Sequence, residues 1–257
     1  MWRVIRIVIL LFILATVAQG AWLARTRTTA WDRTLHVVIY PINGDGSLPV
    51  ERYIGELSGA AFEPIEAFFG KEAKNHGVGL RPPILVALAP PVSSHPPAPP
   101  FGGGKAEILV WSLRLRYWAY WNDSYKRAKP DVRIFVSYYD PAVRPRLAHS
   151  TGLQKGLIGV VNAFATADMS GSNNVVIAHE LLHTFGATDK YDLASNLPLH
   201  PDGFADPDAR PLYPQERAEI MAGRIPISET QAQVPAGMEE VAIGARTARE
   251  INWVKLR

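Results

Sequence analysis

A glutamate that directly follows one histidine and precedes another carries the clearest chemical signal in this sequence. His179, Glu180 and His183 form the pattern H-E-x-x-H. Residues four apart on a helix are separated by about 40° around its axis, so both imidazoles would project from one face and could bind one Zn²⁺. Glu180 lies about 100° from His179, where it could take a proton from an attacking water without binding the metal itself. The alternative interpretation is an ordinary amphipathic helix with two solvated histidines.

The residues that follow predict a third ligand and the turn that delivers it. Gly186 suits the position just after a helix, where a positive φ favours glycine. The chain can then double back, so that the carboxylate of Asp189 meets the same metal. Asp189 would otherwise be a turn residue with only local hydrogen bonds. In the segment 192–215, which is rich in Asp and Pro, His200 is the best alternative ligand, because imidazole is a preferred zinc donor.

The run H-E-L-L-H-T-F-G-A-T-D over residues 179–189 resembles the metzincin zinc metallopeptidases, whose signature is H-E-x-x-H-x-x-G-x-x-H. Asp189 stands in place of the third His, as in the snapalysin-like branch of that clan. Metzincins also carry a Met-turn beneath the zinc, and Met221 fits that role. Some metzincins place a Tyr two residues after this Met, where the present chain has Gly223. The specific resemblance covers residues 173–223.

The resemblance implies a metzincin-like α+β fold, with a twisted mixed sheet over the active-site helix, a Met-turn and a C-terminal helix. It also implies a zinc-dependent endopeptidase, in which His179, His183 and Asp189 bind the zinc and Glu180 is the general base. The expected partner is a protein or peptide substrate. Because Gly223 stands where some metzincins have a Tyr, the nearest candidates for a hydrogen-bond donor to the transition state are Tyr191 and Tyr213.

Two other interpretations remain open. One is a metzincin-like binding domain of the cell envelope that has no catalytic activity, although binding alone does not require the general base Glu180. The other is a gluzincin-like hydrolase with Glu216 or Glu219 as the third ligand, which the turn glycine Gly186 and the position of Met221 disfavour.

Four apolar runs predict buried strands, because each is short and bounded by turn residues. Helical spacing predicts a helix over 49–76, which Pro64 should kink or divide. The helix with the two histidines is expected over 173–186, with Ser172 or Asn173 as its N-cap. The predicted strands cover residues 35–42, 84–88, 131–139 and 157–165.

Other segments have less regular patterns. Residues 89–104 are proline-rich and then glycine-rich, which predicts a surface loop or a docking segment for another protein. Residues 107–121 fit either a strand or a helix, and their many aromatic side chains suit core packing, a substrate-binding wall or a membrane-facing patch. A final helix is expected over 236–253. The resemblance to metzincins also implies an edge strand beside the substrate cleft, for which residues 163–167 are the candidate.

Composition limits the kinds of fold and partner. With 257 residues and 47% hydrophobic content, the chain can bury a substantial core, most simply as one domain. It contains no cysteine, so a metal must be held by histidine and carboxylate rather than by thiolate. The formal net charge is only +3 and the basic residues are scattered, so no nucleic-acid partner is expected.

The N-terminus has the composition of a targeting segment. Two arginines precede an apolar run over residues 7–18, and a small-x-small pattern at 18–20 resembles a signal-peptidase site. If the segment is not cleaved, it would anchor the chain in a membrane. Residues 1–24 are therefore a predicted signal peptide or N-terminal anchor. Residues 25–257 are the predicted catalytic domain, exported to the periplasm or the extracellular side.

Overall fold

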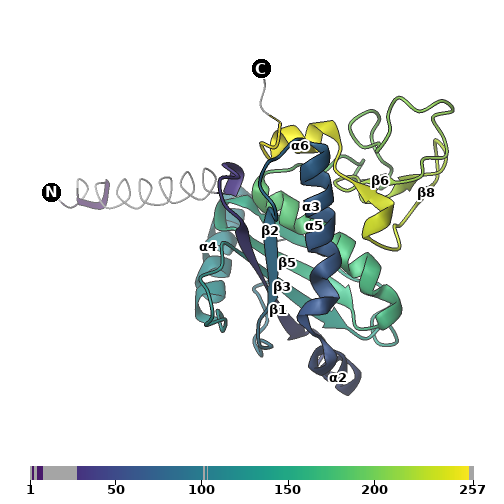
Figure 1. Cartoon of the computed structure of the whole chain (residues 1–257). Helices are drawn as coiled ribbons and strands as arrows, with labels where there is room; N and C mark the ends of the chain where they lie inside the picture. The colour runs from purple at the N-terminus through teal and green to yellow at the C-terminus, as the bar shows by residue number, and fades with distance from the viewer. Residues whose placement is uncertain (1, 3–4, 8–27, 101, 103, 255–257) are drawn as a thin grey trace.

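A twisted five-stranded sheet lies at the centre of the fold (Figure 1). Its strands are β1 (Leu35–Asn43), β2 (Ile84–Leu88), β3 (Val132–Tyr139), β4 (Thr151–Leu153) and β5 (Ile158–Phe164). The order across the sheet is β2-β1-β3-β5-β4. Neighbouring strands from β2 to β5 in this order pair in parallel, and β4 pairs antiparallel with β5.

The computed structural model describes residues 2, 5–7, 28–100, 102 and 104–254. The predicted signal peptide or anchor over 1–24 therefore lies almost entirely outside the described residues. Within the described part of the chain, no helix combines the length and the apolar character that are needed to cross a membrane.

The α+β class and the mixed sheet are confirmed. The four predicted strands are also confirmed, since their ends differ from those of β1, β2, β3 and β5 by one residue at most. The sequence does not predict β4, because three residues with a central glycine carry no strand periodicity.

Side chains of the central strands alternate between two cores, one on each face of the sheet. In β1, Val37 and Ile39 belong to one core, whereas Val38 and Tyr40 belong to the other. Because both faces are covered, the strand reads as a nearly continuous apolar run.

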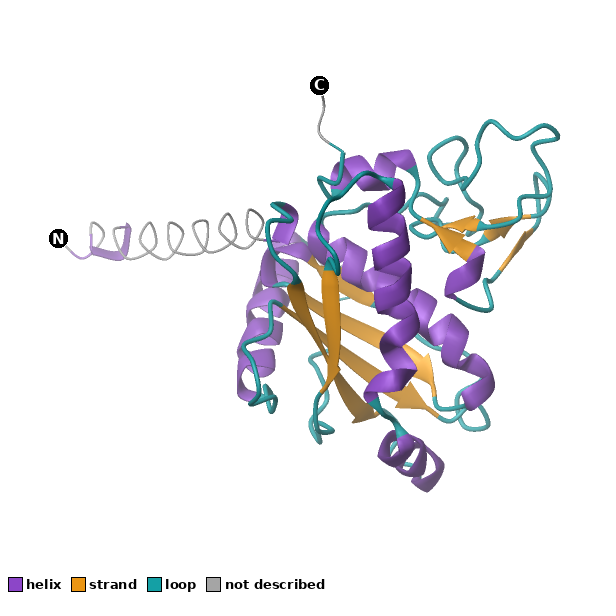
Figure 2. Ribbon diagram, viewed as in Figure 1, coloured by secondary structure: helices purple, strands orange, loops and turns teal. Residues whose placement is uncertain are grey.

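Helices cover both faces (Figure 2). Their bounds are α2 (Leu48–Glu56), α3 (Glu63–Asn75), α4 (Lys105–Trp121) and α5 (Ser170–Phe185). The first core is closed by α2, α3 and α5, and the second by α4 through Trp111, Leu115 and Ala119. Residues 107–121, which fit either strand or helix in the sequence, are therefore helical.

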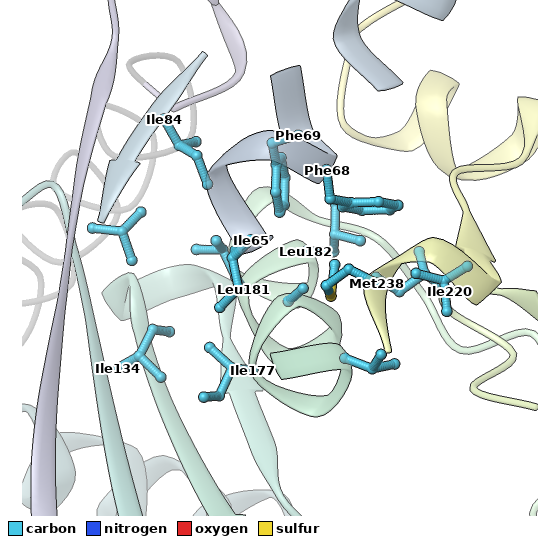
Figure 3. Close-up of a cluster of buried hydrophobic side chains, with 14 of the residues drawn as sticks. Ile65, Phe68, Phe69, Ile84, Ile134, Ile177, Leu181, Leu182, Ile220 and Met238 are labelled. Carbon is cyan, nitrogen blue, oxygen red and sulfur yellow. The ribbon is translucent and has the colours of Figure 1, made fainter. Parts of the chain in front are cut away.

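Figure 3 shows how the first core holds α5. Ile177 and Leu181 of α5 lie between Ile134 of β3 and two side chains of α3, Ile65 and Phe69. All five are at most 1% exposed. Burial of each such side chain contributes about 1.5–3 kcal/mol, so this side of α5 is firmly fixed.

The predicted helix over 49–76 is divided, but not at Pro64. α2 ends at Glu56, and a 3₁₀ turn over Gly59–Phe62 separates it from α3. Pro64 lies in the first turn of α3, where a missing N–H removes no helical hydrogen bond.

The predicted N-cap of α5 is wrong. The helix begins at Ser170, and Met169 occupies the cap position without a side-chain hydrogen bond. The side chain of Asn173 instead exchanges two hydrogen bonds with the backbone of Phe164, at 3.2 and 2.9 Å. Ser172 donates to the carbonyl of Pro235 at 2.9 Å. Both side chains therefore attach the helix to neighbouring segments.

The predicted final helix over 236–253 is also wrong in extent. Only α6 (Ala245–Glu250) is α-helical. Before it, β9 (Val241–Ala242) pairs with β6 (Ala218–Glu219), and a second short pair joins β7 (Ile225–Pro226) to β8 (Ala232–Gln233). Backbone pairing with a distant segment fixes residues 241–242 as strand, and local spacing gives no information about such a partner.

A charged group joins the end of α4 to the sheet. Asp123 accepts hydrogen bonds from the Tyr40 hydroxyl at 2.6 Å and from the Arg133 guanidinium at 2.9 and 2.6 Å. Burial alone would raise the pKa of Asp123, but the hydrogen bonds from Tyr40 and Arg133 lower it below its usual value. The ionised carboxylate therefore stabilises the folded state above its unfolded pKa of about 3.9, and this contribution is lost as the pH falls through the lower folded pKa.

We expect Asp123→Asn to lower the free energy of unfolding by about 1.5–3 kcal/mol at neutral pH, because Arg133 loses its anionic partner. The difference from the parent should shrink as the pH falls below about 4. Chemical denaturation at several pH values measures both effects. Asp208→Asn, at an exposed position, is the control and should change stability by less than about 0.5 kcal/mol. A difference that does not depend on pH would contradict the ionic account.

Candidate metal centre

Helix α5 presents His179 and His183 on a side that the core does not cover. Their side chains keep 13% and 18% exposure, whereas Ile177, Leu181 and Leu182 are buried. The centroids of the two imidazole rings are 4.7 Å apart. The i, i+4 spacing therefore brings both rings to one place.

Each histidine is oriented by a backbone carbonyl. Nδ1 of His179 lies 2.9 Å from the carbonyl oxygen of Ile220, and Nδ1 of His183 lies 2.9 Å from that of Ala187. Because a carbonyl oxygen can only accept, each Nδ1 is the donor. Nε2 of each ring is then directed into the site, as in histidine ligands whose other nitrogen is held by a second group.

Asp189 reaches both rings. Its Oδ1 lies 3.1 Å from Nε2 of His179 and 3.1 Å from Nε2 of His183. Ligand atoms around a tetrahedral zinc, with bonds of about 2.0–2.1 Å, are separated by about 3.3 Å. Both distances from the Asp189 oxygen are therefore close to those between ligand atoms of a zinc site.

The turn after α5 returns the chain toward the histidines. Gly186 has φ 105° and ψ 8°, the left-handed conformation that favours glycine at a helix end. The amide of Gly186 donates to the carbonyl of His183 and that of Ala187 to the carbonyl of Leu182, both at 3.1 Å. These bonds close the last turn of α5 and direct the following residues back across the ends of the imidazoles.

Glu180 is buried beside the two histidines. His179, Glu180 and His183 each offer a ligand atom, these atoms lie within 4.8 Å of one another, and the group could hold a metal ion. Oε2 of Glu180 is buried without a hydrogen-bond partner. Burial raises the pKa of the Glu180 carboxyl above its usual value. A buried polar atom without a partner is unusual in proteins, and it points to a role toward a ligand or water.

Two carboxylates thus border the histidine pair. Burial alone would lower the pKa of His179, but the hydrogen bond with Asp189 and the charge of Glu180 raise it to about 9. The hydrogen bonds from both histidines lower the pKa of Asp189, although burial opposes this. A proton and a metal ion compete for the same imidazole nitrogen, so metal binding here must release protons.

Glu250 of α6 holds the residues on both sides of Asp189. The amide and the hydroxyl of Thr188 donate to its carboxylate, each at 3.0 Å. The ammonium of Lys190 donates to it at 2.8 Å and to the Thr188 carbonyl at 2.8 Å. Arg246 adds a fourth donor at 3.0 Å. This carboxylate therefore fixes the backbone from which Asp189 projects.

A second buried carboxylate shapes the turn around Met221. One oxygen of Glu219 accepts from the amides of Met221 at 2.7 Å and Ala222 at 3.1 Å. The other accepts from the Thr247 hydroxyl at 2.6 Å and the Gly244 amide at 3.1 Å. Met221 itself is fully buried. The same turn supplies the carbonyl of residue 220 that orients the first histidine.

The alternative ligands lie elsewhere. Both oxygens of Glu219 already accept hydrogen bonds within the protein, and Glu216 is exposed. The group of possible metal ligands found among the described residues includes neither of them, nor Asp189, whose place in the site rests on its distances to the two histidines. His200 is exposed, and its Nε2 lies 3.2 Å from the carbonyl oxygen of Pro207.

An open cleft of about 300 Å³ runs past His179 and Glu180. Residues 147–150, which lead into β4, line it, and so do residues 222–224 and 234–235. The predicted edge strand at 163–167 is wrong in extent. β5 ends at Phe164, residues 165–167 are not strand, and the edge of the sheet is β4, which pairs with residues 158–160 of β5.

Glycine allows β4 to pack directly on the histidine helix. A Cβ at Gly152 would clash with the carbonyl oxygen of Glu180 and would lie 2.6 Å from Cβ of His183. A glycine inside a strand often marks such a close approach. This glycine is the one local signal by which the sequence could have shown that β4 lies beside the site.

The two tyrosines have different surroundings. Tyr191 lines the cleft, and burial, followed by the charges of Asp189 and Glu180, raises the pKa of its hydroxyl. Tyr191 therefore remains a hydrogen-bond donor at neutral pH. Tyr213 packs against Phe204, with 5.7 Å between ring centroids, and does not line the cleft.

Sequence reasoning missed the role of Glu250 and considered Glu219 only as a ligand. Each carboxylate acts through bonds to residues that are distant in the chain. The separation is 62 positions for Thr188 and Glu250 and 28 for Glu219 and Thr247. No local pattern marks such pairs.

Comparisons with known proteins assign no family to this geometry. No protein-family model matches the sequence, and no curated protein matches it.

We expect Glu250→Ala to weaken zinc binding about 10–100-fold, because the residues beside Asp189 lose their common acceptor. Glu250→Gln should lose less zinc affinity than Glu250→Ala, since the amide oxygen can still accept a hydrogen bond from Thr188. Competition with a fluorescent chelator measures the zinc Kd, and circular dichroism checks the fold.

Glu229→Ala removes an exposed carboxylate and is the matched control for the loss of one negative charge. The positioning role of Glu250 is disproved if Glu250→Ala binds zinc as tightly as Glu229→Ala does.

Proposed function

We propose that this protein is a zinc-dependent endopeptidase of metzincin type. The observation that carries the proposal is the meeting of three ligand atoms, two Nε2 and one carboxylate oxygen, beside a buried carboxylate with a free oxygen. His179, His183 and Asp189 would hold the zinc, and Glu180 would be the general base.

The donor set suits catalytic zinc. Two imidazole nitrogens and one carboxylate oxygen leave a fourth position for water or substrate. Zinc bound there would polarise the scissile carbonyl and make an attacking water more acidic. With each Nδ1 directed at a backbone carbonyl, Nε2 of each histidine is the nitrogen left to bind the metal once any proton on it is released.

Glu180 is suited to accept and return a proton. Its Oε2 is buried and without a partner, and burial raises its pKa, which strengthens it as a base once ionised. In the proposed reaction it takes a proton from the attacking water and passes it to the leaving amine. A protein that only bound a partner would have no use for a base held in this way.

The cleft supports an extended peptide as substrate. The outer edge of β4 has no strand paired to it among the described residues, and an edge of this kind can hydrogen-bond an extended chain. Tyr191 lies on the cleft, where its hydroxyl could donate to the carbonyl oxygen under attack. The predicted N-terminal signal or anchor would place this activity on the periplasmic or extracellular side of a membrane.

The arrangement of the chain also agrees with the metzincin plan. The sheet lies on one side of α5, the buried Met221 turn supports His179 through the carbonyl of residue 220, and α6 follows that turn. Asp189 remains the departure from the usual third histidine.

We expect the parent to bind about one zinc per chain and to cleave an unstructured protein such as casein. Glu180→Gln should keep the zinc and lose at least about 100-fold in kcat. Asp189→Ala should lose most of the zinc. Plasma mass spectrometry measures the metal, and release of fluorescent peptides measures cleavage.

Asp192→Ala is the matched control, because its carboxylate bonds only to nearby residues of its own loop and both zinc and activity should persist. If the parent binds no zinc, the protein is not a zinc-dependent endopeptidase. If Asp189→Ala keeps its zinc and His200→Ala loses it, His200 is the third ligand in place of Asp189.

A further inference from the structure

Helix α4 has an apolar outer face opposite the side that packs on the sheet. Trp111, Leu115 and Ala119 are buried in the second core. A helix that covers a sheet normally turns polar residues outward, and large exposed apolar patches mark interaction sites. We call the following set the α4 outer face: Leu109 (57% exposed), Val110 (48%), Leu113 (45%), Tyr117 (69%), Tyr120 (73%) and Trp121 (68%).

We propose that the α4 outer face rests in the headgroup region of an anionic lipid membrane. One half of the face is aliphatic and the other half is aromatic. The rings of Tyr117 and Tyr120 each lie beside that of Trp121, with centroids 6.1 and 5.6 Å apart. Tyr and Trp have apolar bodies and polar tips, which favour the boundary between lipid and water.

The charges around the face favour anionic lipid over a protein core or a second copy. α4 carries three basic residues and one acidic residue, and the acidic one, Glu107, already accepts from the Gly104 amide at 3.2 Å. Arg114 is exposed beside the face, and exposed Lys126 and Arg127 follow the helix. Basic side chains around an apolar helix face are typical of interfacial helices on anionic bilayers.

The length of chain before the fold permits this contact. The apolar run of the sequence ends at residue 18, and the described fold begins at Thr28. Ten extended residues span at most about 35 Å. If the run stays in a membrane, the folded part is therefore held close to the lipid surface. The proposal does not depend on the peptidase activity.

The absence of cysteine allows a direct test with single-cysteine variants of the full chain. Leu113→Cys places an environment-sensitive fluorophore on the α4 outer face. Leu193→Cys places it at an exposed site (78%) in the 190–215 region, which Figure 1 shows at the other end of the molecule. Both variants are reconstituted with vesicles of phosphatidylcholine and phosphatidylglycerol, with and without nitroxide-labelled lipid.

We expect nitroxide lipid to quench the Leu113→Cys probe at least about two-fold and to leave the Leu193→Cys probe unchanged, because an interfacial face sinks about 5–10 Å into the headgroup region. Leu109→Asp, added to Leu113→Cys, should remove most of this quenching while circular dichroism remains unchanged.

Equal quenching at the two sites would overturn the proposal. So would a Leu113→Cys probe that stays unquenched. If the unquenched probe is shielded from water only at high protein concentration, a second copy covers the face. If it is shielded from water at every concentration, the chain's own N-terminal segment covers the face.

Discussion

The site depends on the way in which helix α5 is buried. From Ser172 to the end of the helix, only Ser172, Val176, His179 and His183 keep appreciable exposure. These positions follow the i, i+4, i+7, i+11 spacing of one helical stripe. All other side chains in that part of the helix are fixed by the core or by neighbouring segments. The helix cannot rotate without burying the histidines or exposing the core, so packing sets the direction of both imidazoles.

Buried and partly buried carboxylates hold the segments that surround the histidines of α5. Glu219 shapes the turn that orients one histidine, and Glu250 holds the backbone around Asp189. Glu72 of α3 accepts from the Ile243 amide at 2.9 Å and fixes the start of the C-terminal segment. Burying a carboxylate is costly unless several donors reach it. Here the donors are mostly backbone amides and hydroxyls, so each carboxylate determines a backbone path in a region that has little regular secondary structure.

The sequence predicts the parts of this protein whose signals are local. The H-E-x-x-H spacing, the glycine after the helix and the four apolar runs each lie within a few residues, and periodicity or turn chemistry interprets them directly. The C-terminal region was mispredicted as one helix, because its strand and its short helix α6 are defined by partners far away in the chain. The edge strand β4 was missed for the same reason, since its position follows from pairing with β5. Asp189 could be identified as a candidate ligand, but the group that fixes it could not.

The bond between Thr188 and Glu250 spans 62 positions, and this separation has a consequence for synthesis. A ribosome adds residues in order, so a nascent chain carries both histidines and Asp189 well before it carries α6. Until α6 is made and docks, the backbone on either side of Asp189 lacks the acceptor that orders it. If the proposed three-ligand site is correct, its full affinity for metal therefore appears only after the C-terminal segment has folded. Completion of the fold would then act as the step that activates the protein.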